Sequence, residues 1–490
     1  ITTGDWSSDV CSSDLIPPRF FVGAQEAPAL RRRGRALREQ PMDPRRGVGE
    51  AAGWFMKKVM LAAALLALPA AGLCGQDFGI KFSGFVKSDF FHDSRQTVSL
   101  REGHFLLYPA GISRDVRGED VNDRGSFNYL AIQTRLTGAI TAPDAFGAKV
   151  SGVLEADFFG NESAALVDAN GFRLRHAYAK LAWTNTELLL GQYWHPLFVP
   201  ACFSEVISFN TGAPMQPFAR NPQVRLTHRL GPLRLIAAAA AQRDFAGGGG
   251  SAPLRNSSIP DLNAQVHFSH AADGGARELL AGVGGEFKTL RPLLQTTGED
   301  GAFKTDEEIS SAAAMAFLKY HTPSLTGKVQ GVYGQNLYDL TMLGGYAVTD
   351  VLDPERNAVA YTTVDCFAIW SEIIVRHGPR WQYALWAGYT ENLGADDSVV
   401  VYSYRVDGTD VTVRGASVDN TSDIKRVLRV SPRVVATAGS LSVALETEYT
   451  RADYAARTAD GKLCRDKYGK VTKTDHVDNS RVLFSTILKF

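Results

Sequence analysis

The sequence predicts an all-β fold, a transmembrane up-and-down antiparallel β-barrel of about 16 strands. From Phe78 onward apolar and polar residues alternate, which is typical of strands with two different faces. The connections between these segments are alternately short and long along the chain. A sandwich offers no reason for such regularity, whereas a barrel with one tight rim and one elaborate rim predicts it.

A membrane environment also explains why the sheet should close. Unpaired backbone groups cost several kcal/mol each in hydrocarbon, so an open sheet edge is excluded and a closed barrel is favoured. Barrels of this kind are typical of the bacterial outer membrane, which is the predicted location, with outer-membrane lipid around the wall. The last segment alternates up to the aromatic Phe490, and this ending looks like the signal that the outer-membrane assembly machinery recognises.

The amino-terminal part of the chain is expected to lie outside the barrel. Residues 1–55 start without Met and show no periodicity, and residues 6–15 resemble translated sequencing-adapter read-through. We therefore interpret residues 1–55 as a non-native or disordered extension. Residues 56–75 join a short positive region to an apolar run of about 15 residues, shorter than the roughly 20 that a membrane-spanning helix needs. This pattern predicts a cleaved signal peptide, followed by a barrel over residues 76–490.

Composition excludes several classes of protein. The 52 basic and 52 acidic residues balance, so no polybasic character indicates nucleic-acid binding. Cys202, Cys366 and Cys464 are the cysteines of the barrel region, and their odd number argues against a disulfide scaffold. A Cys202–Cys464 bridge stays open. No paired cysteine or histidine spacing indicates a metal site, and no cofactor is expected.

Sixteen segments have strand character. The apolar face of the second segment, for example, consists of Leu130, Ile132, Leu136 and Ile140. Residues 171–183 change face midway, which indicates a bulge, and the alanines within 309–320 also allow a helix. The segments start at residue 78 and continue at 127–141, 147–159, 171–183, 187–194, 222–230, 233–244, 261–270, 278–291, 308–321, 325–338, 363–377, 380–392, 424–437, 440–454 and 478–490.

The third of the long connections, residues 195–221, differs from the others. It is rich in proline, shows no sustained period and is flanked on both sides by arginines. Long loops without regular structure inside an ordered domain are usually functional. We therefore expect this loop to fold into the barrel and narrow a pore.

The wall of the predicted pore carries many basic side chains. About sixteen strands leave an aqueous lumen, whereas about eight are filled by side chains. Because a narrow aqueous cleft between low-dielectric walls amplifies fixed charges, the pattern predicts diffusion of small hydrophilic, preferentially anionic solutes. The alternative is that these charges only hold water and pair with carboxylates of the loops. The basic candidates are Arg135, Arg173, Arg175, Arg220, Arg225, Arg229, Arg429 and Arg433.

A resemblance to a known family rests on residues 171–227. This stretch resembles the DcaP-like trimeric porins, and beyond it the likeness is only architectural. The resemblance implies a sixteen-stranded outer-membrane homotrimer for small anionic solutes, and it adds Gln192 and Trp194 to the pore-lining candidates. Family members can carry a helical segment before the barrel, whereas here residues 76–78 lead straight into the first strand. The matching runs are Arg173-Leu174-Arg175-His176-Ala177-Tyr178, Gly191-Gln192-Tyr193-Trp194 and Arg220-Asn221-Pro222-Gln223-Val224-Arg225-Leu226-Thr227.

A barrel in the outer membrane can also serve two other classes of function. An enzyme inside the barrel needs a nucleophile beside a base, yet none of His176, His267 and His377 has one in a recognisable setting, so no enzyme is expected. A non-conducting structural or adhesive barrel would act through its long outside loops. Whether residues 195–221 enter the lumen and leave an open constriction separates this alternative from a porin.

Overall fold

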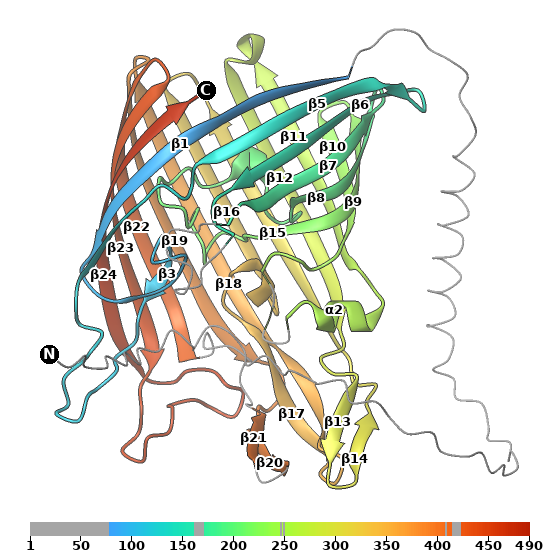
Figure 1. The fold of residues 1–490 in the computed structure, drawn as a ribbon, viewed down its shortest axis with the longest axis vertical. Helices are drawn as coiled ribbons and strands as arrows, with labels where there is room; N and C mark the ends of the chain where they lie inside the picture. The colour runs from blue at the N-terminus through green and yellow to red at the C-terminus, as the bar shows by residue number, and fades with distance from the viewer. Residues whose placement is uncertain (1–77, 161–170, 246, 248–249, 407–408, 414–422) are drawn as a thin grey trace, which may run out of the picture. The chain divides into compact units, whose positions relative to one another are not determined.

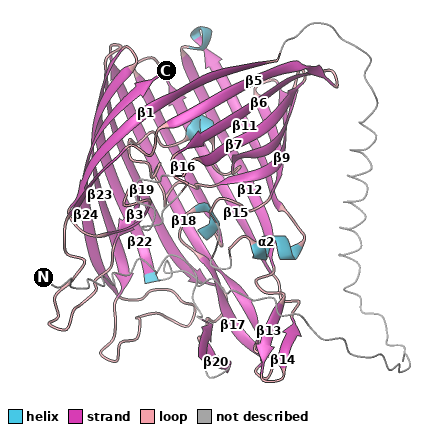
Figure 2. Cartoon of the chain, viewed as in Figure 1, coloured by secondary structure: helices cyan, strands magenta, loops and turns pink. Residues whose placement is uncertain are grey.

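The computed structural model describes residues 78–160, 171–245, 247, 250–406, 409–413 and 423–490. The extension predicted at residues 1–55 and the signal peptide predicted at 56–75 lie outside the described residues. No helix in the described ranges is long and apolar enough to cross a membrane. Nearly all of the regular structure is strand (Figure 2).

Sixteen antiparallel wall strands close into one barrel, which confirms the predicted fold class (Figure 1). The first wall strand, β1 (Gly79–Asp93), pairs on one side with β24 (Thr474–Lys489). On its other side it pairs with β4 (Ser126–Leu130) and β5 (Arg135–Ala145), two parts of one interrupted wall strand. The others are β6 (Ala148–Asp157), β7 (Arg173–Ala182), β8 (Thr186–Trp194), β9 (Arg220–Leu230), β10 (Leu233–Ala240), β11 (Asp261–Ala272), β12 (Arg277–Leu290), β15 (Ile309–His321), β16 (Leu325–Gln335), β18 (Ala358–His377), β19 (Trp381–Ala395), β22 (Ile424–Ala438) and β23 (Leu441–Ala455).

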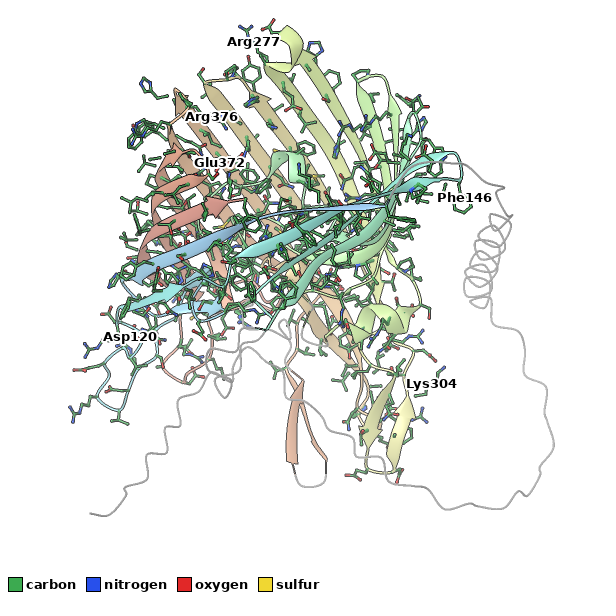
Figure 3. The ribbon with its side chains drawn as sticks, turned by 45° about the horizontal axis from the view of Figure 1, so that its top comes forward. Asp120, Phe146, Arg277, Lys304, Glu372 and Arg376 are labelled. Carbon is green, nitrogen blue, oxygen red and sulfur yellow. The ribbon has the colours of Figure 1, made fainter. Side chains whose placement is uncertain are left out.

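The two rims of the barrel differ as the connections predicted. Tight turns join the strands at one rim, the upper one in Figure 1, and three of these turns place a glycine in the left-handed region. Gly231, Gly378 and Gly439 have φ angles of 59°, 61° and 60°, which glycine adopts without steric cost. Arg277 marks this rim in Figure 3, and Lys304 lies far from it at the opposite end.

The long connections contain regular structure that the sequence did not predict. The added strands have four or five residues each, too few for a clear alternation, except β17, which has nine and pairs with the first part of β18. They are β2 (Thr97–Leu100) with β3 (Phe105–Pro109), β13 (Gln295–Gly298) with β14 (Gly301–Lys304), β20 (Tyr402–Val406) with β21 (Thr409–Val413), and β17 (Gly345–Asp353), which pairs with β18. The short helices of these connections are η3 (Pro200–Cys202), α2 (Ala252–Ser257) and η5 (Tyr338–Leu340), whereas η4 (Asp273–Gly275) lies in the short turn between β11 and β12.

The two faces of the wall have opposite character. In β1, Phe82 and Val86 are 58% and 45% exposed on the outer face, whereas Lys87 and Asp89 are buried on the inner face. β15 is a strand throughout, so the helical alternative for its alanines is wrong. The predicted bulge in β7 is present. The pairing of β6 with β7 shifts by one residue at Arg175.

Two facing assignments from the sequence are wrong. The pattern predicts Leu130 and Ile132 on the outward face of a continuous strand over residues 127–141. In β4, however, Phe127 and Tyr129 are the exposed residues, and Leu130 packs inward against the same apolar cluster as Ile132. In the structure residues 131–134 leave the sheet between β4 and β5, and this break turns Ile132 inward. Ile132 is buried in an apolar cluster with Phe159 and Phe209. A break of four residues resets the alternation, and the sequence pattern alone did not locate it.

The outer face gives a first testable prediction. Leu445 is 45% exposed on the outer side of β23. Replacing it with Arg should lower the free energy of unfolding in lipid vesicles by roughly 2–4 kcal/mol if this position lies near mid-depth, because the guanidinium then faces hydrocarbon. The Leu445→Ala variant controls for loss of the side chain. Equal unfolding free energies for the two variants in urea titrations would contradict the outward orientation of Leu445.

Candidate functional site

The segment of residues 195–219, called the inner segment below, lies against inner-face side chains from strands all around the barrel. Wall side chains donate hydrogen bonds to its carbonyl groups, and wall carboxylates accept from its backbone N–H groups. Glu446 of β23 accepts from Ile207 N and Ser208 N at 2.8 and 3.0 Å, and Glu372 of β18 accepts from Glu205 N at 3.1 Å. The donors are Gln265 to Pro196 (2.7 Å), Gln330 to Leu197 (3.0 Å), Lys328 to Phe203 (2.9 Å), Lys87 to Ile207 (2.6 Å) and Arg429 to Ala213 (2.6 Å).

Apolar side chains of the inner segment fill part of the lumen. Leu197, Cys202 and Met215 are fully buried and pack in one cluster with Trp370 and Trp386 of the wall. A second cluster joins the inner segment to the β2–β3 hairpin and consists of Phe105, Ile132, Phe159, Phe198, Phe209, Ala213 and Phe218. Burying this much apolar surface holds the segment inside the barrel.

A cluster of guanidinium groups lies on the wall formed by β5, β6 and β7. Arg175 is 2% exposed, with Nε 2.8 Å from Glu155 Oε1 and Nη1 2.7 Å from Asp157 Oδ2. Arg173 donates to both oxygens of Asp157 at 3.1 Å, and Arg135 Nε lies 3.7 Å from Glu155 Oε1. The β7 bulge turns Arg175 toward the same carboxylates as Arg173.

Trp194 connects this cluster to the inner segment. Its ring stacks on Phe198 with the ring centroids 4.0 Å apart, and the guanidinium carbons of Arg175 and Arg220 lie 5.6 and 5.3 Å from the Trp194 ring centroid. Arg220 pairs with Asp244 at 2.7 Å. Such cation–π contacts stabilise buried guanidinium groups. Two of the four guanidiniums in this cluster therefore contact Trp194, and the four together face three carboxylates.

The other predicted site residues lie elsewhere in the lumen. Gln192 donates to the backbone oxygen of Arg175 at 3.0 Å, so its amide supports the arginine cluster. Arg429 and Arg433, both in β22, lie away from this cluster. Arg429 holds the carbonyl of Ala213, and Arg433 Nη1 lies 2.8 Å from Glu372 Oε1. Arg429 therefore anchors the inner segment directly, whereas Arg433 pairs with a wall carboxylate that accepts from the backbone of the segment.

Arg225 and Arg229 line a separate cavity of about 260 Å³, called the basic cavity below. It lies under residues 199–201 of the inner segment, toward the tight turns, and is bounded by β7 to β12. Its charged lining comprises Lys180, Arg225, Arg229 and Arg234 together with one carboxylate, Glu187.

The charges of the basic cavity are only partly compensated. Arg229 Nη2 lies 2.8 Å from Glu187 Oε1, and Lys180 Nζ lies 3.7 Å from Glu187 Oε2. Arg225 has no carboxylate within 4.0 Å among the residues the structure describes, and its guanidinium carbon lies 5.5 Å from the ring centroid of Tyr193. Four cations against one carboxylate give this part of the lumen a positive potential.

The carboxylate of Glu205, in the inner segment, is stabilised by a lysine of the wall. Burial alone would raise the pKa of the Glu205 carboxyl, but the ammonium of Lys328 outweighs burial and holds the pKa below its ordinary value. The contact between Glu205 and Lys328 is therefore ionic at neutral pH. Cys202 and Cys464 are both free, so the disulfide that the sequence left open is absent.

Sequence reasoning missed the wall groups that fasten the inner segment. Glu372 and Glu446 are both 1% exposed, and each receives backbone N–H groups from the segment. The sequence signal that could have identified these wall groups is a carboxylate at an inward position near the middle of a long strand. Such a residue needs a partner, because an isolated buried charge is costly. The sequence does not show that the partner is the backbone of a loop more than 150 residues away.

No protein-family model and no curated protein matches the chain. The crystal structure of the outer membrane channel DcaP of Acinetobacter baumannii matches with a TM-score of 0.56 and 18% sequence identity, covering 86% of this chain and 100% of that chain. The chain has the DcaP fold.

Two further solved structures resemble this chain more distantly. An anion-selective porin from Comamonas acidovorans and in-vitro folded OmpT, an outer membrane protein of Vibrio cholerae, each match with a TM-score of 0.46 and 10% identity. They cover 84% and 86% of this chain and 100% of their own. The fold assignment rests on DcaP, and the roles of individual residues rest on the contacts of this chain.

Proposed function

We propose that the protein is a porin of the bacterial outer membrane that gives passive diffusion to small hydrophilic, preferentially anionic solutes. The observation that carries this proposal is the basic cavity, in which four cations face one carboxylate inside a closed barrel. Fixed charge in a narrow aqueous space with low-dielectric walls attracts solutes of opposite charge and repels those of the same charge.

The proposed path for solutes runs beside the inner segment. The guanidinium cluster around Trp194 forms the proposed constriction, and the basic cavity is the adjoining space on the side of the tight turns. A planar guanidinium can bind both oxygens of a carboxylate, so these side chains suit small carboxylates better than they suit neutral solutes. Because the cluster is nearly balanced by Glu155, Asp157 and Asp244, the uncompensated charge near Arg225 contributes most of the preference.

The proposal includes the surroundings of the barrel. Exposed apolar residues such as Phe82 and Leu445 on the outer face support contact with outer-membrane lipid. A homotrimer and recognition of the terminal strand by the outer-membrane assembly machinery are part of the same proposal. Chemical cross-linking of the protein in native membranes, followed by denaturing electrophoresis, tests the trimer. Recovery of monomer without cross-linked dimer or trimer would contradict it.

The Arg225→Ala variant tests the charge of the basic cavity. We expect it to conduct, and we expect its reversal potential in a salt gradient to move toward the value of a non-selective pore, because the cavity loses a cation that has no carboxylate partner among the described residues. The matched control is Arg277→Ala, since Arg277 is an exposed arginine at the tight-turn rim, paired with Asp273. The proposal predicts a clear shift for Arg225→Ala and almost none for Arg277→Ala, and equal shifts would contradict it.

A second function is favoured by a specific observation. The two apolar clusters bury aromatic and aliphatic side chains of the inner segment against the wall, and such packing obstructs a water-filled path. This packing favours a non-conducting structural or adhesive barrel that acts through its long outside loops. Conductance separates the two functions, since such a barrel folds in a bilayer without passing current.

A further inference from the structure

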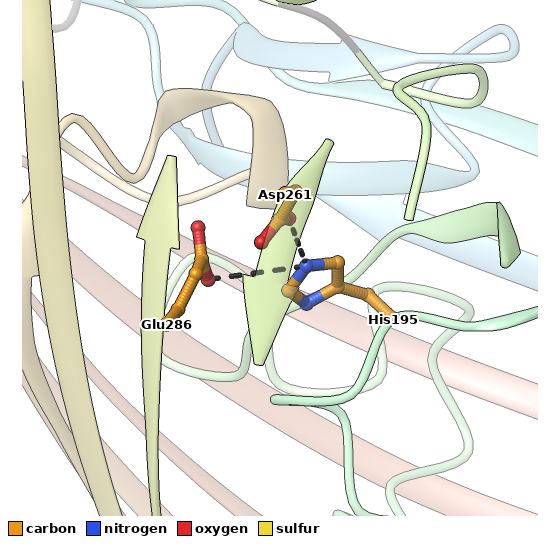
Figure 4. A group of neighbouring side chains, drawn as sticks. All are labelled: His195, Asp261 and Glu286. Carbon is orange, nitrogen blue, oxygen red and sulfur yellow. Dashed lines mark hydrogen bonds and ion pairs between the residues drawn. The ribbon is translucent and has the colours of Figure 1, made fainter. Parts of the chain in front are cut away.

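We propose that His195, Asp261 and Glu286 form a binding site for one divalent transition-metal ion of the zinc type. The three residues come from different parts of the chain. His195 begins the inner segment, Asp261 begins β11, and Glu286 lies in β12 (Figure 4). The proposal is independent of anion diffusion, because it concerns how the inner segment is attached to the wall.

The geometry of the three residues suits such an ion. Their nearest ligand atoms all lie within 4.8 Å of one another. His195 Nε2 lies 2.8 Å from Asp261 Oδ2 and 3.8 Å from Glu286 Oε2. Two ligands about 2.1 Å from a tetrahedral zinc ion are about 3.4 Å apart, and the two observed separations lie on either side of this value. An imidazole nitrogen with two carboxylate oxygens is a known donor set for zinc and its neighbours, and it leaves one coordination position for water.

The second observation is that buried carboxylate oxygens at this place lack partners. The side chains of Asp261 and Glu286 are both 2% exposed. Asp261 Oδ1 and Glu286 Oε2 are buried without a hydrogen-bond donor among the described residues, although Glu286 Oε2 faces His195. Buried carboxylate oxygens without donors are costly, and a cation between them removes that cost.

The charge balance also favours a divalent ion. The ammonium of Lys288 lies 3.2 Å from Glu286 Oε1 and 2.6 Å from Asp339 Oδ1. Within the described part of the chain, ion pairs connect these carboxylates only to Lys288 and His195. Three carboxylates and one ammonium leave two negative charges. Protonated His195 balances one of them, whereas a divalent cation balances both.

Binding requires a small change at His195. The backbone N of Leu197 lies 3.3 Å from Nδ1 of His195, so in the neutral form of His195 the proton is on Nε2, which donates to Asp261. An ion on Nε2 needs the other tautomer, in which Nδ1 holds the proton, and the long contact with Leu197 is then lost. The ion would connect the start of the inner segment to two adjacent wall strands, so its role would be to fasten this end of the segment.

The test is metal binding by the protein refolded with zinc and then passed through a chelating column. We expect one zinc ion to be retained per chain by elemental analysis, and cobalt to replace it with ligand-field absorption bands. The Glu286→Gln and Asp261→Asn variants keep the shape of the side chain. They should bind zinc at least about tenfold more weakly, because a neutral amide replaces a carboxylate ligand. The control is His270→Ala, which removes an exposed histidine of the same strand and should bind zinc like the wild type.

X-ray absorption at the zinc edge of the wild-type protein keeps the test independent of how the variants fold. One imidazole and oxygen ligands in the first coordination shell would support the site. A shell without imidazole, less than one ion per chain after chelation, or wild-type affinity in Glu286→Gln would overturn it and leave His195–Asp261 as an ordinary hydrogen-bonded pair.

Discussion

The Glu372→Leu variant is expected to lose about 3–5 kcal/mol of unfolding free energy, because removing one partner of a buried ion pair leaves the other charge unpaired. The side chain of Glu372 is fully buried and lies 2.8 Å from Arg433 Nη1 and 3.0 Å from Lys328 Nζ. Both of its oxygens also accept from Glu205 N at 3.1 Å. Leucine fills the space but leaves two buried cations and a backbone N–H without this partner.

Urea unfolding of the refolded protein in lipid vesicles measures this loss. The control is Asp273→Asn, because Asp273 and Arg277 form an ion pair at 3.1 Å in which both side chains are about 60% exposed. Exposed pairs contribute about 0–1 kcal/mol, so the control should unfold almost like the wild type. If Glu372→Leu were no less stable than Asp273→Asn, Glu372 would not stabilise the attachment of the inner segment to the wall.

The second large effect concerns conductance. Replacing residues 197–217 with a short Gly-Ser linker should raise single-channel conductance several-fold, because a sixteen-stranded barrel without its inner segment leaves a wide aqueous lumen. The replacement is sterically simple. His195 N donates to Ala219 O at 2.9 Å, and Trp194 pairs with Arg220 across the base of the segment, so a short linker can join the two ends.

Shortening the β13–β14 hairpin to a tight turn is the matched control for this replacement. The hairpin lies beyond the barrel at the end opposite the tight turns (Figure 1), so its loss should leave conductance unchanged. An unchanged conductance after loss of residues 197–217 would mean that the inner segment does not limit the path of ions.

The barrel could be predicted from the sequence because its signals are local and repeated. Alternation in segments such as residues 440–454 directly indicates which side chains face outward. The lengths of the connections indicate at which of the two rims each connection lies. The break at residues 131–134 was not predictable in this way, because Leu130, Ile132 and Leu136 continue the alternation in the sequence although the outward face changes from Tyr129 to Leu136 across the break. The added hairpins, such as β13–β14, were missed because four residues per strand carry too little pattern.

The candidate site was only partly predictable. Arg173, Arg175, Arg220 and Trp194 are brought together because Arg175 is the bulged residue of β7, Arg173 lies two positions before it, and the other two form the base of the inner segment. Arg429 was placed with them from its inward position, yet in the structure it holds the backbone of residue 213. Which carboxylate neutralises which arginine depends on register between distant strands, and a single sequence does not contain that information.

Single-channel recording of the protein refolded into a planar bilayer, with the reversal potential measured under a salt gradient, tests the central claim most directly. The proposal predicts discrete conductance steps and a reversal potential of the sign expected for anion preference. A barrel that folds and inserts but never conducts, or one that prefers cations, would contradict an anion-preferring porin.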